Sequence, residues 1–266
     1  MNSLVDLFFE QYKKQNKKNI FLTSLSNPDK KYSWEDTYSN IIKLSNEISK
    51  YIQKGDRCLL ISENRPEWMI SDLSIMLAGG ITVPAYTTYV SSDYEYIIND
   101  CKPSVVLVSN DEQFNKVKSI CERNPAIKKI FSFETLTGIE NDGYINIENL
   151  INDKGINQEP KLEFYAKRSD PACIIYTSGT QGSPKGVILS HGGILSNCEG
   201  GYELLKPILE NETRFLTWLP LSHSYEHAVQ FIQIAVGAKV FYAESIDKLI
   251  KNMSECSPHI MTAVPR

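Results

Sequence analysis

The segment Ile174–Gly193 reads IIYTSGTQGSPKGVILSHGG, and its pattern decides the fold assignment. Apolar residues 171–176 predict a short buried strand, and the ten residues 177–186 that follow contain no large aliphatic side chain. A strand that runs into a glycine-rich turn and then a helix presents clustered backbone N–H groups, which suit phosphate oxygens. We therefore expect a phosphate-binding loop here.

The predicted loop adds hydroxyl donors and one cation to the backbone N–H groups. Its candidate binding residues are Thr177, Ser178, Gly179, Thr180, Gln181, Gly182, Ser183, Pro184, Lys185 and Gly186. The pattern does not fit the Walker A sequence, since Pro184 precedes the lysine and Gly186 follows it, and it is not the dinucleotide pattern GxGxxG. The structural alternative is an exposed turn, in which Gly, Ser and Pro are common.

Outside this loop, strand and helix patterns alternate along the chain. Ser33 and Asp36 form a capping-box pattern, Pro66 stands where a helix would begin, and Gly79 and Gly80 stand where it would end. Strands that alternate with helices predict an α/β fold with layered, mostly parallel sheets and helices on both faces. Residues 134–168 are polar and poorly periodic, so we expect a surface excursion there.

Composition and charge limit the function classes. The 266 residues have a net charge of -4 at pH 7, which gives no support for nucleic-acid binding. No apolar run reaches the roughly 20 residues needed to span a bilayer, while peripheral membrane contact stays open. The six cysteines are scattered without a CxxC pair, which indicates buried, reduced cysteines and a cytoplasmic location. Oligomeric state is left undetermined.

The loop residues YTSGTQGSPKG resemble the phosphate-gripping signature of the adenylate-forming enzymes, a superfamily of acyl-CoA synthetases, peptide-synthetase adenylation domains and luciferases. Three further segments resemble long-chain fatty-acid–CoA ligases in order and spacing. They read KGDRCLLISENRPEWMISDLSIMLAGGITVPAY (54–86), LPLSHSYEH (219–227) and, at residues 242–266, YAESIDKLI followed by PHIMTAVPR.

The resemblance implies that a fatty acid attacks the α-phosphate of ATP and that coenzyme A then displaces AMP. It implies that residues 177–185 hold the β- and γ-phosphates, with Lys185 as a point charge, and that the Thr177 hydroxyl contacts Mg²⁺. It places His223 beside the carboxylate and the reacting phosphate as the candidate catalytic residue. The alternative for His223 is a histidine that only packs at a strand end.

A different interpretation starts from His223, Glu226 and His227, which fit the HxxEH pattern of a zinc hydrolase. That chemistry needs both histidines on one helical face and a third ligand downstream. Because Ser222 or Ser224 is the natural helix cap, His223 should lie at or before the helix start. Another adenylate-forming ligase and a non-catalytic nucleotide-binding remnant are also compatible with the sequence.

The resemblance also implies a domain organisation. We expect a partial N-terminal AMP-binding domain over 1–266, in which residues 1–55 and 213–266 form one α/β subdomain. Residues 56–212 would form a second subdomain that carries the phosphate loop at 176–186. The predicted strand at 258–264 comes close to Arg266, so we expect the chain to be incomplete. The resemblance implies that the C-terminal lid domain is absent and that this chain does not turn over alone.

Overall fold

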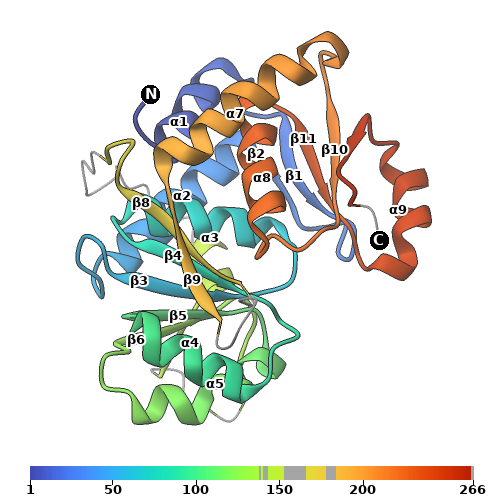
Figure 1. The fold of residues 1–266 in the computed structure, drawn as a ribbon. Coiled ribbons are helices and arrows are strands. Elements are labelled where there is room, and N and C mark those ends of the chain that lie inside the picture. The colour runs from blue at the N-terminus through green and yellow to red at the C-terminus, as the bar shows by residue number, and fades with distance from the viewer. Residues whose placement is uncertain (138, 140–142, 153–165, 178–183, 265–266) are drawn as a thin grey trace.

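Two β-sheets form the framework of the chain in a computed structural model that describes residues 1–137, 139, 143–152, 166–177 and 184–264 (Figure 1). The five-stranded sheet has the order β12-β10-β11-β1-β2, and the seven-stranded sheet has the order β7-β6-β5-β3-β4-β8-β9. Neighbouring strands are parallel except for the pairs β1–β2 and β8–β9. The predicted fold class is confirmed.

The strands of the five-stranded sheet are β1 (Ile20–Ser24), β2 (Lys31–Ser33), β10 (Arg214–Thr217), β11 (Lys239–Tyr242) and β12 (Ile260–Met261). Those of the seven-stranded sheet are β3 (Arg57–Ile61), β4 (Ile81–Ala85), β5 (Val105–Val108), β6 (Lys129–Ser132), β7 (Tyr144–Asn146), β8 (Pro171–Thr177) and β9 (Lys185–Ser190). Each sheet therefore draws on its own part of the sequence, the first on both ends of the chain and the second on its middle.

The helices are α1 (Leu4–Lys14), α2 (Trp34–Ile48), α3 (Pro66–Leu77), α4 (Ser91–Cys101), α5 (Asp111–Arg123), α6 (Ile147–Asn152), α7 (His191–Leu205), α8 (Ser224–Val236) and α9 (Leu249–Cys256). Two 3-10 turns, η1 (Lys206–Ile208) and η2 (Ile246–Lys248), adjoin α7 and α9. Figure 1 shows α4 and α5 on the outer face of the larger sheet and α2 and α3 on its inner face.

Burial on both faces explains why β3 is apolar from Cys58 to Ile61. Cys58 and Leu60 belong to the core that includes α2 and α3, whereas Leu59 and Ile61 belong to the core beneath α4 and α5. Successive side chains of a strand point to opposite faces, so a strand covered on both sides needs apolar residues at every position. The RCLLI run in the sequence thus marks a central strand.

Aromatic stacking packs the N-terminal segment onto the smaller sheet. The Trp34 ring stacks on Phe21 at a centroid distance of 3.8 Å and on Phe8 at 5.8 Å, and all three side chains are buried. The predicted capping box is present, since the Ser33 hydroxyl accepts from the Asp36 N–H and the Asp36 carboxylate accepts from the Ser33 N–H. The start of α2 is therefore fixed by its own sequence.

Three predictions about elements are wrong. The segment 134–168 is not only a surface excursion, because it contains α6 and β7, and β7 extends the larger sheet beside β6. A strand was missed between the glycine-rich loop and the helix expected from about Gly192, because Lys185–Ser190 forms β9 and pairs antiparallel with β8 before α7 begins at His191. The strand expected at 258–264 is confined to the two residues of β12.

The six cysteines are free thiols with buried side chains, as the sequence predicts. None of the helices in the described parts of the chain has the length and apolar character needed to cross a bilayer.

Adjacent glycines in α7 provide a matched test of helix packing. A Cβ at Gly201 would lie 2.5 Å from Cδ1 and 3.0 Å from Cγ1 of Ile232 on α8, whereas a Cβ at Gly200 would meet no atom within 4 Å. Alanine favours a helix over glycine by about 0.5–1 kcal/mol. We expect Gly200→Ala to raise the free energy of unfolding by that amount and with it the urea midpoint. Gly201→Ala should give a lower midpoint than Gly200→Ala, because α7 must then shift from α8. Equal midpoints for the two variants would show that Ile232 does not hold α7 at this distance.

Candidate functional site

The carboxyl ends of strands from both sheets face a common cavity of about 280 Å³. Ligands of parallel α/β sheets usually bind at this edge. The cavity is lined after β3 by Ser62, Glu63 and Asn64, after β4 by Tyr86, Thr87 and Thr88, after β10 by Trp218, Pro220 and Ser222, and after β11 by Ala243, Glu244, Ser245 and Ile246. The junction between the sheets is therefore the candidate site.

The β8–β9 hairpin brings both ends of the predicted phosphate loop to the same edge of the larger sheet. Thr177 ends β8 and lies opposite Lys185, the first residue of β9. Both residues are exposed, and β8 runs parallel to β4, so their edge is the one that carries Tyr86. The remaining predicted loop residues, Ser178, Gly179, Thr180, Gln181, Gly182 and Ser183, lie outside the described residues.

Helix α4 holds the hairpin through two tyrosines. Tyr96 donates a hydrogen bond to the Pro184 carbonyl at 2.8 Å, and Tyr176 donates one to the Asp100 carboxylate. Burial, followed by the hydrogen bond to Asp100, raises the pKa of Tyr176, so its hydroxyl stays a donor at neutral pH. The two tyrosine rings meet edge to face at 6.4 Å. These contacts fix the base of the loop.

Gly186 has a packing reason to be glycine. A Cβ at this position would lie 2.8 Å from Cγ2 of Ile174 and 3.2 Å from Cζ of Tyr176. The cross-strand position opposite Tyr176 therefore stays open for the tyrosine ring, which reaches Asp100.

His223 caps helix α8 with its own side chain. Its Nδ1 accepts from the Tyr225 N–H at 3.2 Å, which leaves Nε2 for a ligand on an exposed side chain. His223 lies at the start of the helix, as predicted, but the N-cap is His223 itself and not Ser222 or Ser224. An imidazole here sits at the positive end of the helix dipole, where a carboxylate or phosphate is favoured.

Asn64 fixes the segment that leads to His223. Its side-chain amide donates to the Leu219 carbonyl at 2.6 Å, and its side-chain carbonyl accepts from the Leu221 N–H at 3.0 Å. One side chain after β3 therefore holds the loop after β10, which links the two sheets at the cavity.

The other residues of the HxxEH pattern point away from His223. His227 is fully buried, and its Nε2 lies 2.8 Å from the Asp72 carboxylate. Glu226 is also buried and accepts from the Thr262 hydroxyl at 2.6 Å. Burial raises the pKa of Glu226 to about 7, although the Thr262 bond opposes the rise. Within the described ranges, no three His, Cys, Asp or Glu side chains are placed to hold a metal. The zinc interpretation is therefore contradicted.

Thr177 offers one side-chain oxygen as a ligand for Mg²⁺. Mg²⁺ prefers octahedral oxygen coordination and in nucleotide sites often takes only one or two protein ligands beside phosphates and waters. The exposed hydroxyl at the end of β8 suits such a role, and the other oxygens would come from the nucleotide and water.

Several residues of the site were missed from the sequence. Tyr96 and Asp100 belong to an ordinary amphipathic pattern in α4, and the pairing of Asp72 with His227 spans 155 positions. No local signal identifies these contacts, although the isolated Asp in the apolar helix α3 indicates a buried charge that needs a partner.

A sequence profile of the AMP-binding enzymes matches residues 8–266. The chain belongs to the AMP-binding enzyme family. It is 30% identical over 246 residues to fatty acyl-CoA synthetase A of Dictyostelium discoideum, covering 88% of this chain and 36% of that protein. It is also 30% identical over 249 residues to long chain acyl-CoA synthetase 3 of Arabidopsis thaliana, covering 89% of this chain and 37% of that protein. It thus spans little more than a third of these relatives.

Among solved structures, the anthranilate CoA ligase AuaEII in complex with anthranoyl-AMP superimposes with a TM-score of 0.85. The match covers 97% of this chain and 49% of that chain at 22% identity. At that identity the likeness shows the fold of an AMP-binding enzyme.

The Asp72–His227 pair predicts a pH-dependent stability. Burial lowers the pKa of His227, but the Asp72 carboxylate outweighs it and raises that pKa to about 10, above the roughly 6.5 of an unfolded histidine. The native state then binds a proton that the unfolded state lacks between these values, and the pair's stabilisation is lost as pH rises through that range. We expect the native chain to have a higher melting temperature than His227→Gln. The difference should be largest at pH 6 and should shrink toward pH 10.

The double variant Asp72→Asn/His227→Gln is the control for that measurement. It leaves no unpaired buried charge, so it should be more stable than His227→Gln at pH 7. A melting temperature difference between the native chain and His227→Gln that stays constant from pH 6 to 10 would contradict the assigned ion pair.

Proposed function

We propose that this chain supplies the phosphate-binding and part of the acyl-binding region of an ATP-dependent long-chain fatty-acid–CoA ligase. The observation that supports this most is the β8–β9 hairpin, which is held by Tyr96 and presents Thr177 and Lys185 at the sheet edge whose β3 and β4 ends line the cavity. Membership of the AMP-binding enzyme family and the similarity to acyl-CoA synthetases support the same activity.

The proposed reaction has two steps. A fatty-acid carboxylate oxygen attacks the α-phosphorus of ATP, the bond to the bridging oxygen breaks, and pyrophosphate leaves. The thiol sulfur of coenzyme A then attacks the acyl carbon, AMP leaves with the electrons of the broken C–O bond, and the thiol proton passes to solvent. An anion must approach a polyanion in the first step, so the site has to neutralise charge and orient the reactants.

The chain's own residues would perform this neutralisation at two places. Lys185 and the N–H groups of residues 177–185 would hold the β- and γ-phosphates, and the Thr177 hydroxyl would contribute an oxygen to Mg²⁺, which would offset phosphate charge. His223 would lie beside the fatty-acid carboxylate and the reacting phosphate, with its ring oriented by the Tyr225 N–H. Asn64 would act as a positioning residue for the His223 segment.

The remaining parts of the proposal concern the whole protein. We infer that residues 1–55 with 213–266 form one subdomain and that 56–212 form the other, and that a longer protein containing this chain carries the complete reaction. Its substrates would be a fatty acid, ATP and coenzyme A, and its location would be cytoplasmic.

Nucleotide binding by the chain tests the role of the hairpin. We expect Lys185→Ala to weaken Mg-ATP and pyrophosphate binding by about tenfold to a hundredfold, because a hydrogen bond to a charged group contributes roughly 1.5–3 kcal/mol. His223→Ala should change either affinity less than about twofold, because it acts on the carboxylate side. Isothermal titration calorimetry on the 266-residue chain measures both, with Lys206→Ala as the control for loss of a distant exposed lysine. Equal losses for Lys185→Ala and Lys206→Ala would refute the assignment.

The substrate class is tested by pyrophosphate exchange in a protein that contains this chain. We expect exchange into ATP to be stimulated by long-chain fatty acids and not by amino acids or aromatic acids, and to fall about a hundredfold or more in His223→Ala. Exchange that only an amino acid stimulates would assign a different adenylate-forming ligase. Nucleotide binding without exchange for any acid would favour a non-catalytic remnant.

A further inference from the structure

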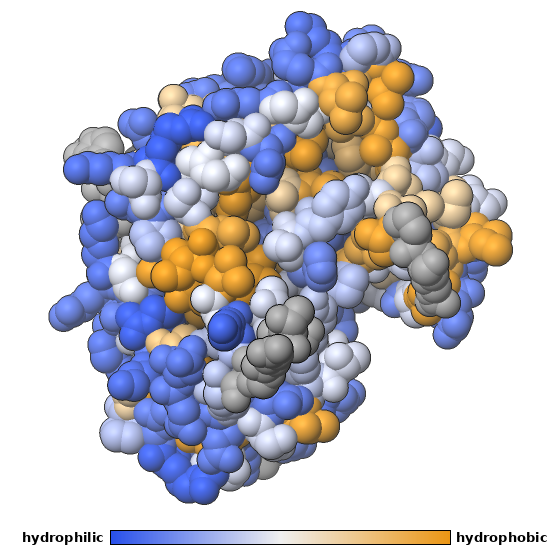
Figure 2. Space-filling model, in the orientation of Figure 1, coloured by the Kyte–Doolittle hydropathy of each residue, from blue (hydrophilic) through white to orange (hydrophobic). Residues whose placement is uncertain are grey.

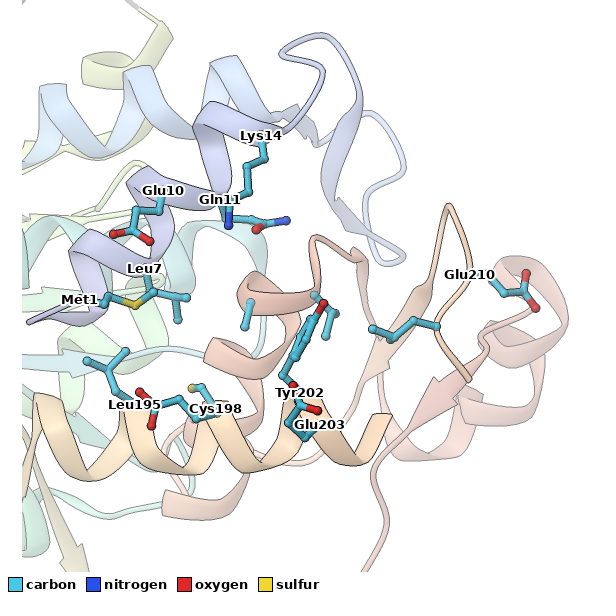
Figure 3. A pocket seen from close by; sticks show the side chains of 14 residues that line it. Met1, Leu7, Glu10, Gln11, Lys14, Leu195, Cys198, Tyr202, Glu203 and Glu210 are labelled. Atoms are coloured by element: carbon cyan, nitrogen blue, oxygen red, sulfur yellow. The ribbon is translucent and has the colours of Figure 1, made fainter. Parts of the chain in front are cut away.

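A second, larger hollow lies between α1 and α7, away from the candidate site (Figure 3). We call it the α1–α7 groove. It has a volume of about 680 Å³ and is lined by Met1, Leu7, Glu10, Gln11, Lys14, Leu195, Cys198, Glu199, Tyr202, Glu203, Leu209, Glu210, Ala235 and Val236. Ala235 and Val236 end α8, so this groove is roughly 20 Å along that helix from His223.

The floor of the groove is apolar. Leu7 from α1 and Leu195 from α7 face it from opposite sides in Figure 3, and both belong to the buried core. Tyr202, Ala235 and Val236 are only half-buried, so apolar surface is open to the groove. Such a surface binds apolar side chains by removing them from water.

The rim of the groove is acidic. Its lining contains four carboxylates, Glu10, Glu199, Glu203 and Glu210, against one basic side chain, that of Lys14, and the terminal amino group of Met1. Glu199 pairs with Arg168 at 3.1 Å and Glu203 with Lys206 at 3.7 Å, both on exposed side chains. Exposed pairs contribute at most about 1 kcal/mol, so a ligand's cations can replace these partners. Glu10 forms no ion pair with any described residue.

Apolar surface continues from the groove past the end of α7. Leu204 is 79% exposed and Ile208 is 57% exposed, and both adjoin the lining residues in sequence. Figure 2 shows an apolar area at the carboxyl end of α7 beside hydrophilic surface. An apolar patch bordered by charge is typical of a protein interaction site.

We propose that the α1–α7 groove binds a cationic amphipathic helix of a partner protein. The apolar floor would accept the leucine-like side chains at i, i+3, i+4 and i+7, and the carboxylates of the rim would pair with lysine or arginine on the flanks of that helix. An anionic membrane would be repelled by the same carboxylates, which decides against a lipid surface. This binding is independent of the proposed ligase reaction.

A synthetic peptide tests the proposal directly. The probe is a fluorescein-labelled helix of about four turns that contains leucine and lysine, with leucine at i, i+3, i+4 and i+7. Its control has the same composition in an order that spreads leucine over all faces. We expect fluorescence anisotropy to show at least about tenfold tighter binding of the amphipathic peptide to the 266-residue chain, because only that peptide can bury a continuous apolar face.

Two variants locate the binding site. Glu10→Gln/Glu203→Gln should weaken binding of the amphipathic peptide about fivefold or more, and Ala235→Lys should do so by placing a cation in the groove. The matched control Glu112→Gln/Glu122→Gln removes the same charge from α5 and should change the affinity less than about twofold. Circular dichroism establishes whether each variant is folded. If Ala235→Lys is not folded, the rim variant Glu10→Gln/Glu203→Gln alone decides the test.

Three results would overturn the proposal. Equal binding of both peptides would mean attraction by net charge alone, and equal losses in the rim and α5 variants would place binding elsewhere. Self-association in sedimentation velocity that Ala235→Lys abolishes would assign the groove to a second copy of this chain.

Discussion

The buried contact between Asp72 and His227 joins the two halves of the molecule. Asp72 lies on α3, one of the helices that cover the larger sheet. His227 lies on α8, which connects β10 and β11 of the smaller sheet along the chain. Both side chains are fully buried, and Gln230 donates a second hydrogen bond to the same carboxylate at 3.1 Å. Removing either partner leaves a charge in an apolar interior, which costs about 3–5 kcal/mol. The geometry of α8 therefore depends on this pair.

The helix that this pair anchors presents different chemistry at its two ends. Its first residues follow His223 beside the cavity at the sheet edges, and its last residues form the floor of the α1–α7 groove. A displacement of α8 along its axis would change both places together, because a packed helix moves as a rigid element. The contact of Gly201 with Ile232 limits such a displacement from the side of α7.

The sequence predicts the layers of this fold better than the contacts within them. The capping box at Ser33 is a local signal that the structure confirms, and the apolar run Cys58–Ile61 is a local mark of a strand buried on both faces. The β8–β9 hairpin was missed because Val187–Leu189 is equally compatible with a strand and with the start of a helix. The short strand β7 lies in a polar segment where its pairing with β6 outweighs its weak local preference.

For the candidate site, the sequence likewise predicts residues at the ends of helices and strands but not the distant residues that hold those ends in place. The sequence placed Thr177 and His223 at the ends of secondary-structure elements, as found. It could not supply Asn64 or Asp100, because their partners lie 155 and 76 positions away and leave no periodic trace.

The β9 strand has a consequence for solubility. It is the last strand of the larger sheet in the described structure, and its Val187 and Ile188 side chains are 44% and 62% exposed. Open edges with aliphatic side chains template the pairing of further strands and so favour aggregation, and a lysine on the edge is a common means of preventing it. Lys185 is the first residue of this strand and is exposed. Its ammonium group would therefore oppose edge-to-edge aggregation at the same position where it would bind phosphate.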